Sequence, residues 1–349
     1  MKKIVMLLAI ILLGIGTFLL YQKSQPMKEK PKNEFQTIGY KEEELTRIDT
    51  LTPEEKEVIK TVPYQKNLLT ILNNEAYKAS NLKAYLSFSN QELAVDDLVY
   101  VVNHNFLTTT YDEITLKLMH QEYYIHARLS RYLEYQKRHP DLDVKEIITR
   151  INSDLDIPFY TNPENTDLTK GFLMIANKHY YLGNYIPEDL VTIDAKYGYQ
   201  GKINATVYEE YKKLFDAAYQ AGMRLAINSP YRSYQTQNTL YNNYSARDGK
   251  AAADTYSARP GYSEHQTGLA MDITSNRSNF DSFENTQEFT WMQEHAHEYG
   301  FILRYPKGKE YITGYIYEPW HYRYVGIEAA TYIREHQITY EEYYAYFVK

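Results

Sequence analysis

The stretch SEHQTGLAMDIT, residues 263–274, joins a polar turn to an apolar strand. Gly268 allows the backbone to turn sharply, and the apolar and β-branched residues after it are typical of a short strand from Ala270 to Thr274. A histidine in such a turn and an aspartate on such a strand can converge on one metal ion. His265 and Asp272 are therefore candidate metal ligands.

A second stretch, EPWHYRYVG at residues 318–326, supplies another imidazole, His321, and the carboxylate of Glu318 three residues earlier. Two histidines and one aspartate make a three-ligand site with an open position, which is the arrangement of catalytic zinc. Calcium and magnesium sites are rich in oxygen ligands and rarely include two imidazoles. Zinc would lower the pKa of a bound water to about 7, and Glu318 fits the role of the base that takes its proton.

The segments around these two stretches change between helices and short strands without a regular order. Such a mixture is typical of the α+β class, so we predict a domain with a small antiparallel sheet flanked by helices. Helices are expected at residues 209–221, 233–247 and 289–299, further strands at 224–228, 301–304 and 317–325, and a loop rich in glycine and alanine at 248–262.

Together the two stretches resemble the D-alanyl-D-alanine carboxypeptidase family of zinc peptidases, which is related to the vancomycin-resistance dipeptidases and to Hedgehog-type domains. The family patterns SxHxxGxAxD and ExWHxRYVG are both complete in this chain. A third family pattern, SGYRSxxxQ, matches SPYRSYQTQ at residues 229–237, with Pro230 where glycine is usual. The resemblance extends over roughly residues 169–349, about half of the chain.

The resemblance implies that His265, Asp272 and His321 bind zinc and that Glu318 is the general base and acid. It further implies that three residues, Arg232, Gln237 and Ser263, contact the terminal residue of the substrate. A guanidinium can grip a carboxylate through two hydrogen bonds, and a carboxypeptidase needs such a group to recognise a chain end. The implied reaction is removal of a C-terminal D-amino acid, D-alanine in the first instance, from peptidoglycan stem peptides.

Other functions compatible with the same motifs are an LD-carboxypeptidase, an endopeptidase of stem peptides, and a metal-bearing binding module without catalysis. A pure binder has no need of Glu318 beside His321, so the motif favours an enzyme. The net charge of −7 and a pI of about 5.9 argue against nucleic acid as a partner. The absence of cysteine excludes disulfides and thiolate metal sites.

The N-terminus has two lysines followed by an uncharged apolar run at residues 4–21. Eighteen residues span about 27 Å as a helix, close to the thickness of a bilayer core. The run has no small-x-small cleavage site after it, so we predict an uncleaved membrane anchor at residues 1–21. Lys2 and Lys3 would hold the N-terminus in the cytoplasm and place the catalytic domain on the extracytoplasmic side of the cell membrane.

Between the anchor and the peptidase domain, which is predicted at residues 168–349, we expect a tether at 22–50 and a mainly helical domain at 51–165. The helical domain contains a faint internal repeat. In it, Tyr85 corresponds to Tyr132 and Asn103 to Asn152. Two degenerate copies are compatible with a repeat architecture and equally with coincidence between amphipathic helices.

Overall fold

The computed structural model describes residues 32–88, 92–275 and 280–349. The chain divides into two compact units, residues 1–119 and 120–349. The predicted anchor at residues 1–21 lies outside the described residues. Within the described ranges, no helix combines the length and the apolar character needed to cross a bilayer.

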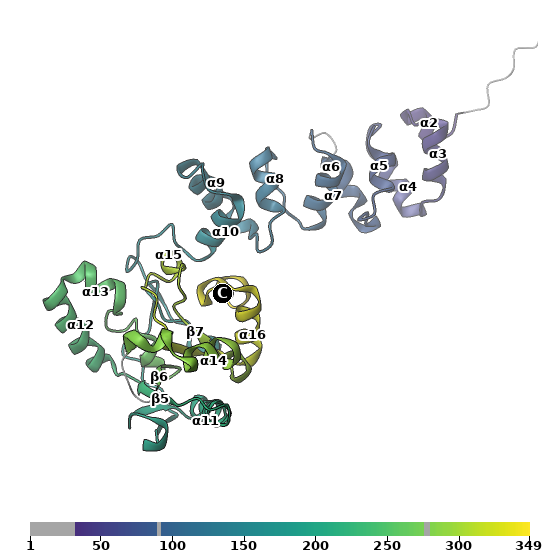
Figure 1. The fold of residues 1–349 in the computed structure, drawn as a ribbon. Coiled ribbons are helices and arrows are strands. Elements are labelled where there is room, and N and C mark those ends of the chain that lie inside the picture. The colour runs from purple at the N-terminus through teal and green to yellow at the C-terminus, as the bar shows by residue number, and fades with distance from the viewer. Residues whose placement is uncertain (1–31, 89–91, 276–279) are drawn as a thin grey trace, which may run out of the picture. The chain divides into compact units, whose positions relative to one another are not determined.

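The first unit consists of short helices in its described part (Figure 1). Buried leucine, isoleucine and aromatic side chains from successive helices form one apolar cluster. The helices are α2 (Glu34–Ile38), α3 (Glu42–Asp49), α4 (Pro53–Lys60), α5 (Leu68–Leu72), α6 (Leu82–Phe88), α7 (Val95–Asn103) and α8 (Glu113–Met119).

The prediction of a tether at residues 22–50 is wrong for its described part, because α2 and α3 lie there and are packed. Phe35, Tyr40, Leu45 and Ile48 are all buried in the apolar cluster of the first unit. These apolar side chains are few, but they lie on one side of the helices. Their burial is enough to hold the helices in the apolar cluster. The side chain of Asn33 also caps the start of α2 in a capping box.

The second unit contains a four-stranded antiparallel sheet in the order β5-β6-β8-β7. The predicted small antiparallel sheet flanked by helices is confirmed. The sheet strands are β5 (Leu225–Ser229), β6 (Ala270–Ser275), β7 (Phe301–Leu303) and β8 (His321–Tyr324), and the shorter strands are β1 (Glu164–Asn165), β2 (Tyr180–Tyr181), β3 (Leu190–Thr192) and β4 (Lys202–Asn204). The helices are α9 (Leu129–Arg138), α10 (Val144–Asn152), α11 (Ala205–Gln220), α12 (Tyr234–Asp248), α13 (Lys250–Tyr256), α14 (Gln287–His295), α15 (Glu310–Thr313), α16 (Ile327–His336) and α17 (Tyr340–Phe347).

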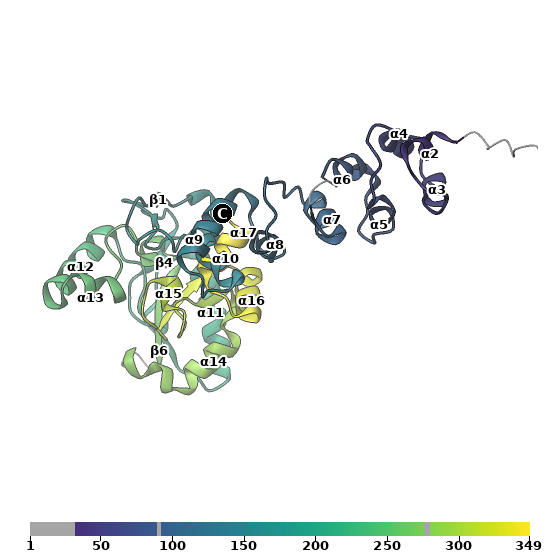
Figure 2. The ribbon, with the colours of Figure 1, turned by 90° about the horizontal axis from the view of Figure 1, so that it is seen from above.

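Helix α11 forms a large part of the core beside the sheet. Its buried residues Val207, Tyr211, Leu214 and Ala218 recur at helical spacing and belong to the same apolar cluster as Ile227 of β5. The α12–α13 hairpin extends from one side of the unit, and α16 lies on the other side in both views (Figures 1 and 2). The hairpin therefore stands apart from the core and borders the site described below.

The loop predicted at residues 248–262 contains helix α13, so that prediction is wrong in its first half. Gly249, with a φ of 83°, breaks the chain direction between α12 and α13. Three consecutive alanines, 251–253, follow within α13, and alanine is the strongest helix former. Gly249 therefore marks a single turn between two helices and does not begin a loop.

Helices α9 and α10, expected in a separate helical domain at 51–165, pack within the second unit. The hydroxyls of Thr149 and Tyr346 are 3.1 Å apart, and the rings of Tyr123 and Tyr346 stack at 3.9 Å. Lys349 also pairs with Asp154. These contacts join segments about 200 residues apart, so the compact unit begins near residue 120, earlier than the predicted 168.

The residue pairs of the predicted repeat occupy equivalent places in two helix pairs. Tyr85 Oη donates to Asn103 Oδ1 at 2.6 Å, and Tyr132 Oη donates to Asn152 Oδ1 at 2.6 Å. In both cases the asparagine amide donates to a backbone carbonyl before the first helix, at 2.8 and 2.9 Å. The same hydrogen bonds thus close the α6–α7 pair in the first unit and the α9–α10 pair in the second.

Candidate active site

His265 lies in the 3-10 turn Glu264–Thr267, directly before β6. Gly268 ends this turn in the left-handed region, with a φ of 70°, and a Cβ there would lie 2.9 Å from Leu190 Cδ2. His265 Nδ1 donates to the carbonyl of Pro230 at 2.8 Å. This hydrogen bond sets the tautomer, so Nε2 carries the lone pair that a metal needs.

Asp272 and His321 face each other because β6 and β8 pair with these two residues in register. Asp272 Oδ1 lies 3.4 Å from His265 Nε2 and 3.4 Å from His321 Nδ1. Ligand atoms of a tetrahedral zinc site, each about 2.0–2.1 Å from the ion, are separated by about 3.4 Å. All three side chains are buried, and His265 Nε2 and Asp272 Oδ1 have no hydrogen-bond partner among the described residues. The donor set therefore fits zinc.

Glu318 is buried beside this cluster, with Oε2 3.4 Å from His321 Nδ1. Its backbone N–H donates to the carbonyl of Tyr305 at 3.1 Å, which joins the Glu318 segment to the residues just after β7. Burial raises the pKa of the Glu318 carboxyl, although the neighbouring His321 opposes the shift. A carboxyl with a raised pKa next to a metal site is suited to take up and return a proton.

Arg232 and Gln237 stand on another wall of the same pocket. Arg232 Nη1 donates to Gln237 Oε1 at 2.8 Å, and Arg232 Nη2 is 3.9 Å from Asp272 Oδ2. Gln237 Nε2 in turn donates to the carbonyl of Ala258 at 2.7 Å. With both ends of its amide occupied, Gln237 supports Arg232, and its predicted contact with substrate stays a prediction.

One cavity of about 330 Å³ brings the predicted residues together. Pro230, the departure from the family pattern, lends its carbonyl to His265 and removes no functional side chain. The predicted residues that line the cavity are Arg232, Gln237, Ser263, His265, Asp272, Glu318 and His321.

Sequence reasoning missed Glu264, which lies behind His321 and is fully buried. Its Oε1 accepts from Arg304 Nε at 2.8 Å and from Arg323 Nη1 at 3.0 Å. Its Oε2 faces His321 Nε2 at 3.7 Å, which turns Nδ1 of this ring toward Asp272. Glu341 of α17 binds Arg304 through two hydrogen bonds, so two buried carboxylates balance two buried guanidiniums.

The charges of the site favour a cation at its centre. Burial would lower the pKa of His321, but the carboxylates of Asp272, Glu264 and Glu318 raise it to about 10. Burial and, after it, the charge of Arg232 lower the pKa of His265 to about 4. Three carboxylates around two imidazoles thus attract positive charge, which a divalent ion supplies.

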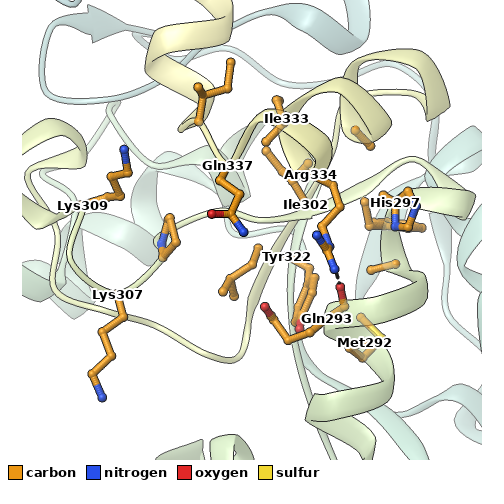
Figure 3. A pocket seen from close by; sticks show the side chains of 16 residues that line it. Met292, Gln293, His297, Ile302, Lys307, Lys309, Tyr322, Ile333, Arg334 and Gln337 are labelled. Carbon is orange, nitrogen blue, oxygen red and sulfur yellow. Dashed lines mark hydrogen bonds between the residues drawn. The ribbon is translucent and has the colours of Figure 1, made fainter. Parts of the chain in front are cut away.

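A second cavity, of about 380 Å³, lies against the other face of β8, where Tyr322 lines it (Figure 3). Neighbouring residues of a strand point to opposite faces, so Tyr322 lines this cavity while His321 lines the first. Lys307, Lys309 and Arg334 are among its lining residues, which include no carboxylate. His297 lines this cavity as well. The two cavities are similar in volume, so volume alone does not identify the active site. The side chains that line the first cavity, with its two histidines and its carboxylates, do identify it.

Fold and site together define a zinc-dependent peptidase. Residues 200–327 match the family model described as VanY, D-alanyl-D-alanine carboxypeptidase. The chain is 45% identical over 192 residues to the "Putative carboxypeptidase YodJ" of Bacillus subtilis, which covers 52% of this chain and 68% of that protein. The chain belongs to the VanY family of D-alanyl-D-alanine carboxypeptidases, a family of zinc peptidases, so the function and the zinc predicted from the sequence are confirmed at the level of the family.

Two solved structures are also similar. The LD-carboxypeptidase LdcB is 42% identical with a TM-score of 0.50, over 53% of this chain and 90% of that chain. A vancomycin-resistance D,D-pentapeptidase, VanY of a VanB-type cassette in complex with Zn(II), is 35% identical with a TM-score of 0.44, over 49% of this chain and 97% of that chain. Three curated enterococcal relatives, two of them named D-alanyl-D-alanine carboxypeptidases, are covered over only 55–64% of their length.

The position of Glu264 predicts that it strengthens zinc binding by orienting His321. Glu264→Gln keeps the shape but removes the charge behind His321 Nε2, so we expect zinc affinity to fall about 10- to 100-fold. The measurement is competition for zinc against a chromophoric chelator.

Glu341→Gln is the matched control, because it removes one carboxylate from the same Arg304 without touching His321. Both variants should lose thermal stability, since each breaks a buried ion pair. Equal losses of zinc affinity in the two variants would contradict a specific role of Glu264.

Proposed function

We propose that this protein releases the terminal D-alanine from peptidoglycan stem pentapeptides, on the outer side of the cell membrane. The observation that carries the proposal is the arrangement of one pocket. Arg232 stands on one wall, Glu318 on another, and the cluster of His265, Asp272 and His321 lies between them.

In this proposal each polar side chain has one task. Arg232, held by Gln237 at 2.8 Å, binds the carboxylate of the terminal residue and so positions the last peptide bond. Glu318 accepts the proton of the attacking water and returns it to the leaving amine. A zinc ion held by His265, Asp272 and His321 supplies Lewis acidity for water and for the peptide carbonyl.

A second candidate function is LD-carboxypeptidase activity, in which a tetrapeptide loses its terminal D-alanine. The 42% identity to the LdcB LD-carboxypeptidase favours it. The 40% identity over 153 residues to the D-alanyl-D-alanine carboxypeptidase of Enterococcus faecalis favours the first. The two activities differ in the stereochemistry of the residue before the cleaved bond, so defined substrates separate them.

Digestion of purified muropeptides, read by mass spectrometry, tests the function. We expect pentapeptide to lose one alanine and tetrapeptide to remain intact. Glu318→Gln should keep its zinc and lower the rate about 100- to 10,000-fold, because the general base is lost. Loss of alanine from tetrapeptide alone would identify the LD activity, and cleavage at an internal bond would identify an endopeptidase.

Arg232 should make the enzyme prefer a free C-terminal acid to the same peptide amidated at its end. Charge-assisted hydrogen bonds contribute about 1.5–3 kcal/mol each, so Arg232→Ala should lower kcat/KM at least about tenfold and erase most of the preference. Arg232→Lys should restore only part of it, because an ammonium lacks the planar fork. Equal cleavage of acid and amide by the wild type would remove this role from Arg232.

We also propose that residues 4–21 anchor the protein in the cell membrane. The support is the uncharged apolar run with two lysines before it. We expect the mature protein to fractionate with membranes and to retain this segment. A mature N-terminus beyond Tyr21, found by mass spectrometry, would show cleavage and contradict the anchor.

A further inference from the structure

Lys178 is a buried ammonium in the second unit, only 3% exposed. Its Nζ donates to the backbone carbonyl of Asp254 at 2.6 Å and to that of Gly314. Three aromatic rings surround it, with centroids 4.3 Å (Tyr315), 5.0 Å (Phe159) and 5.8 Å (Tyr160) from Nζ.

The two carbonyls lie next to two segments that line the catalytic cavity. Asp254 lies in α13, whose chain continues into Ser257 and Ala258, and both of these residues line the cavity and bind Gln237. Gly314 precedes Tyr315 and Ile316 of a second wall, and this segment leads on to Glu318. Lys178 therefore connects the segment that supports Arg232 with the segment that carries the general base.

A direct backbone hydrogen bond also joins the same walls. The N–H of Ile316 donates to the carbonyl of Thr255 at 2.9 Å. The residues of this hydrogen bond, Thr255 and Ile316, lie within two positions of the residues whose carbonyls bind Lys178, Asp254 and Gly314. The state of the Ile316 amide therefore reports whether the two walls are held together.

The charge of Lys178 is costly to bury, and its surroundings are arranged to compensate it. Burial lowers the pKa of its ammonium to about 8, with the Asp254 carboxylate opposing the shift and Arg259 adding to it. Two carbonyls and three ring faces offset the lost hydration. The fit is close: a Cβ at Gly314, whose φ is 74°, would lie 2.8 Å from Phe159 Cζ and 3.0 Å from Lys178 Cδ.

We propose that Lys178 is a positioning residue that braces the two walls of the catalytic cavity, so that Arg232 and Glu318 keep a fixed separation. The brace rests on the proposed function, since it aligns the group that binds the terminal carboxylate with the group that moves the proton. Lys178 touches neither substrate nor metal ligand and acts through Gln237 on one side and through the 314–318 segment on the other.

Lys178→Met tests the brace, because methionine keeps the unbranched stem and removes the ammonium. We expect kcat/KM on muropeptide to fall at least about tenfold while zinc stays bound at full stoichiometry. The preference for a free acid over an amide should also shrink, although Arg232 is still present. Amide hydrogen exchange at Ile316 should accelerate at least about tenfold, with the amides of β6 and β8 unchanged.

Lys170→Met is the matched control. Its ammonium also donates to a backbone carbonyl, that of Val348 at 2.7 Å, but it lies outside the catalytic cavity. This variant should leave kcat/KM, the acid preference and Ile316 exchange unchanged. The proposed role of Lys178 is contradicted if Lys178→Met keeps the wild-type kcat/KM, acid preference and Ile316 exchange. It is also contradicted if both variants change these quantities equally.

Hydrogen exchange keeps the proposal testable if Lys178→Met does not fold or if muropeptides are not cleaved. In the wild type, the brace requires the Ile316 amide to be protected at a level similar to β8, although it lies in an irregular segment at a cavity. Exchange of this amide as fast as in an open loop overturns the brace. If the Ile316 amide is protected but the enzyme does not cleave muropeptides, the proposed function is contradicted and the proposed role of Lys178 is not.

Discussion

The pairing of β6 with β8 is the constraint on which the site depends, because it sets Asp272 opposite His321. Side chains alternate between the two faces of a sheet, so a slip of one residue would turn one of these ligands away from the other. The turn that ends at Gly268 then brings His265 to the same point, and its hydrogen bond to Pro230 fixes the nitrogen it presents. A metal site thus arises from strand register and one turn.

Buried charged and polar groups around this strand pairing determine which nitrogen each histidine offers to a metal. The two histidines offer different nitrogens to a metal, His265 its Nε2 and His321 its Nδ1. The reason is that the carbonyl of Pro230 accepts from Nδ1 of His265, whereas the carboxylate of Glu264 faces Nε2 of His321. Glu264 can hold this place only because Arg304 and Arg323 neutralise its other oxygen. A hydrophobic replacement of such a network is often as stable, so its value here lies in orientation rather than in stability.

The site was predictable from sequence to the extent that its residues lie close together along the chain. Two short motifs contain His265, Asp272, Glu318 and His321. Two imidazoles and one carboxylate are ligands typical of catalytic zinc, so the metal could be predicted as well. Glu264 lies in the same motif but could not be interpreted, because its partners Arg304 and Arg323 lie 40 and 59 residues further along the chain. The role of Lys178 could not be predicted for the same reason, because its partners are backbone carbonyls 76 and 136 residues further along the chain. The packing of α2 and α3, and of α10 with α17, likewise depends on contacts between residues far apart in the sequence.

The choice between an enzyme and a metal-bearing binding module turns on Glu318. Burial raises the pKa of this carboxyl, so keeping it in place costs free energy that a structural role would have to offset. Its neighbour is His321, a candidate ligand that the carboxylates of Asp272 and Glu264 also face. A binding module would be more stable with a neutral residue at this position. The carboxylate makes sense where a proton must be taken from one atom and given to another, so its burial beside the cluster is itself an argument for catalysis.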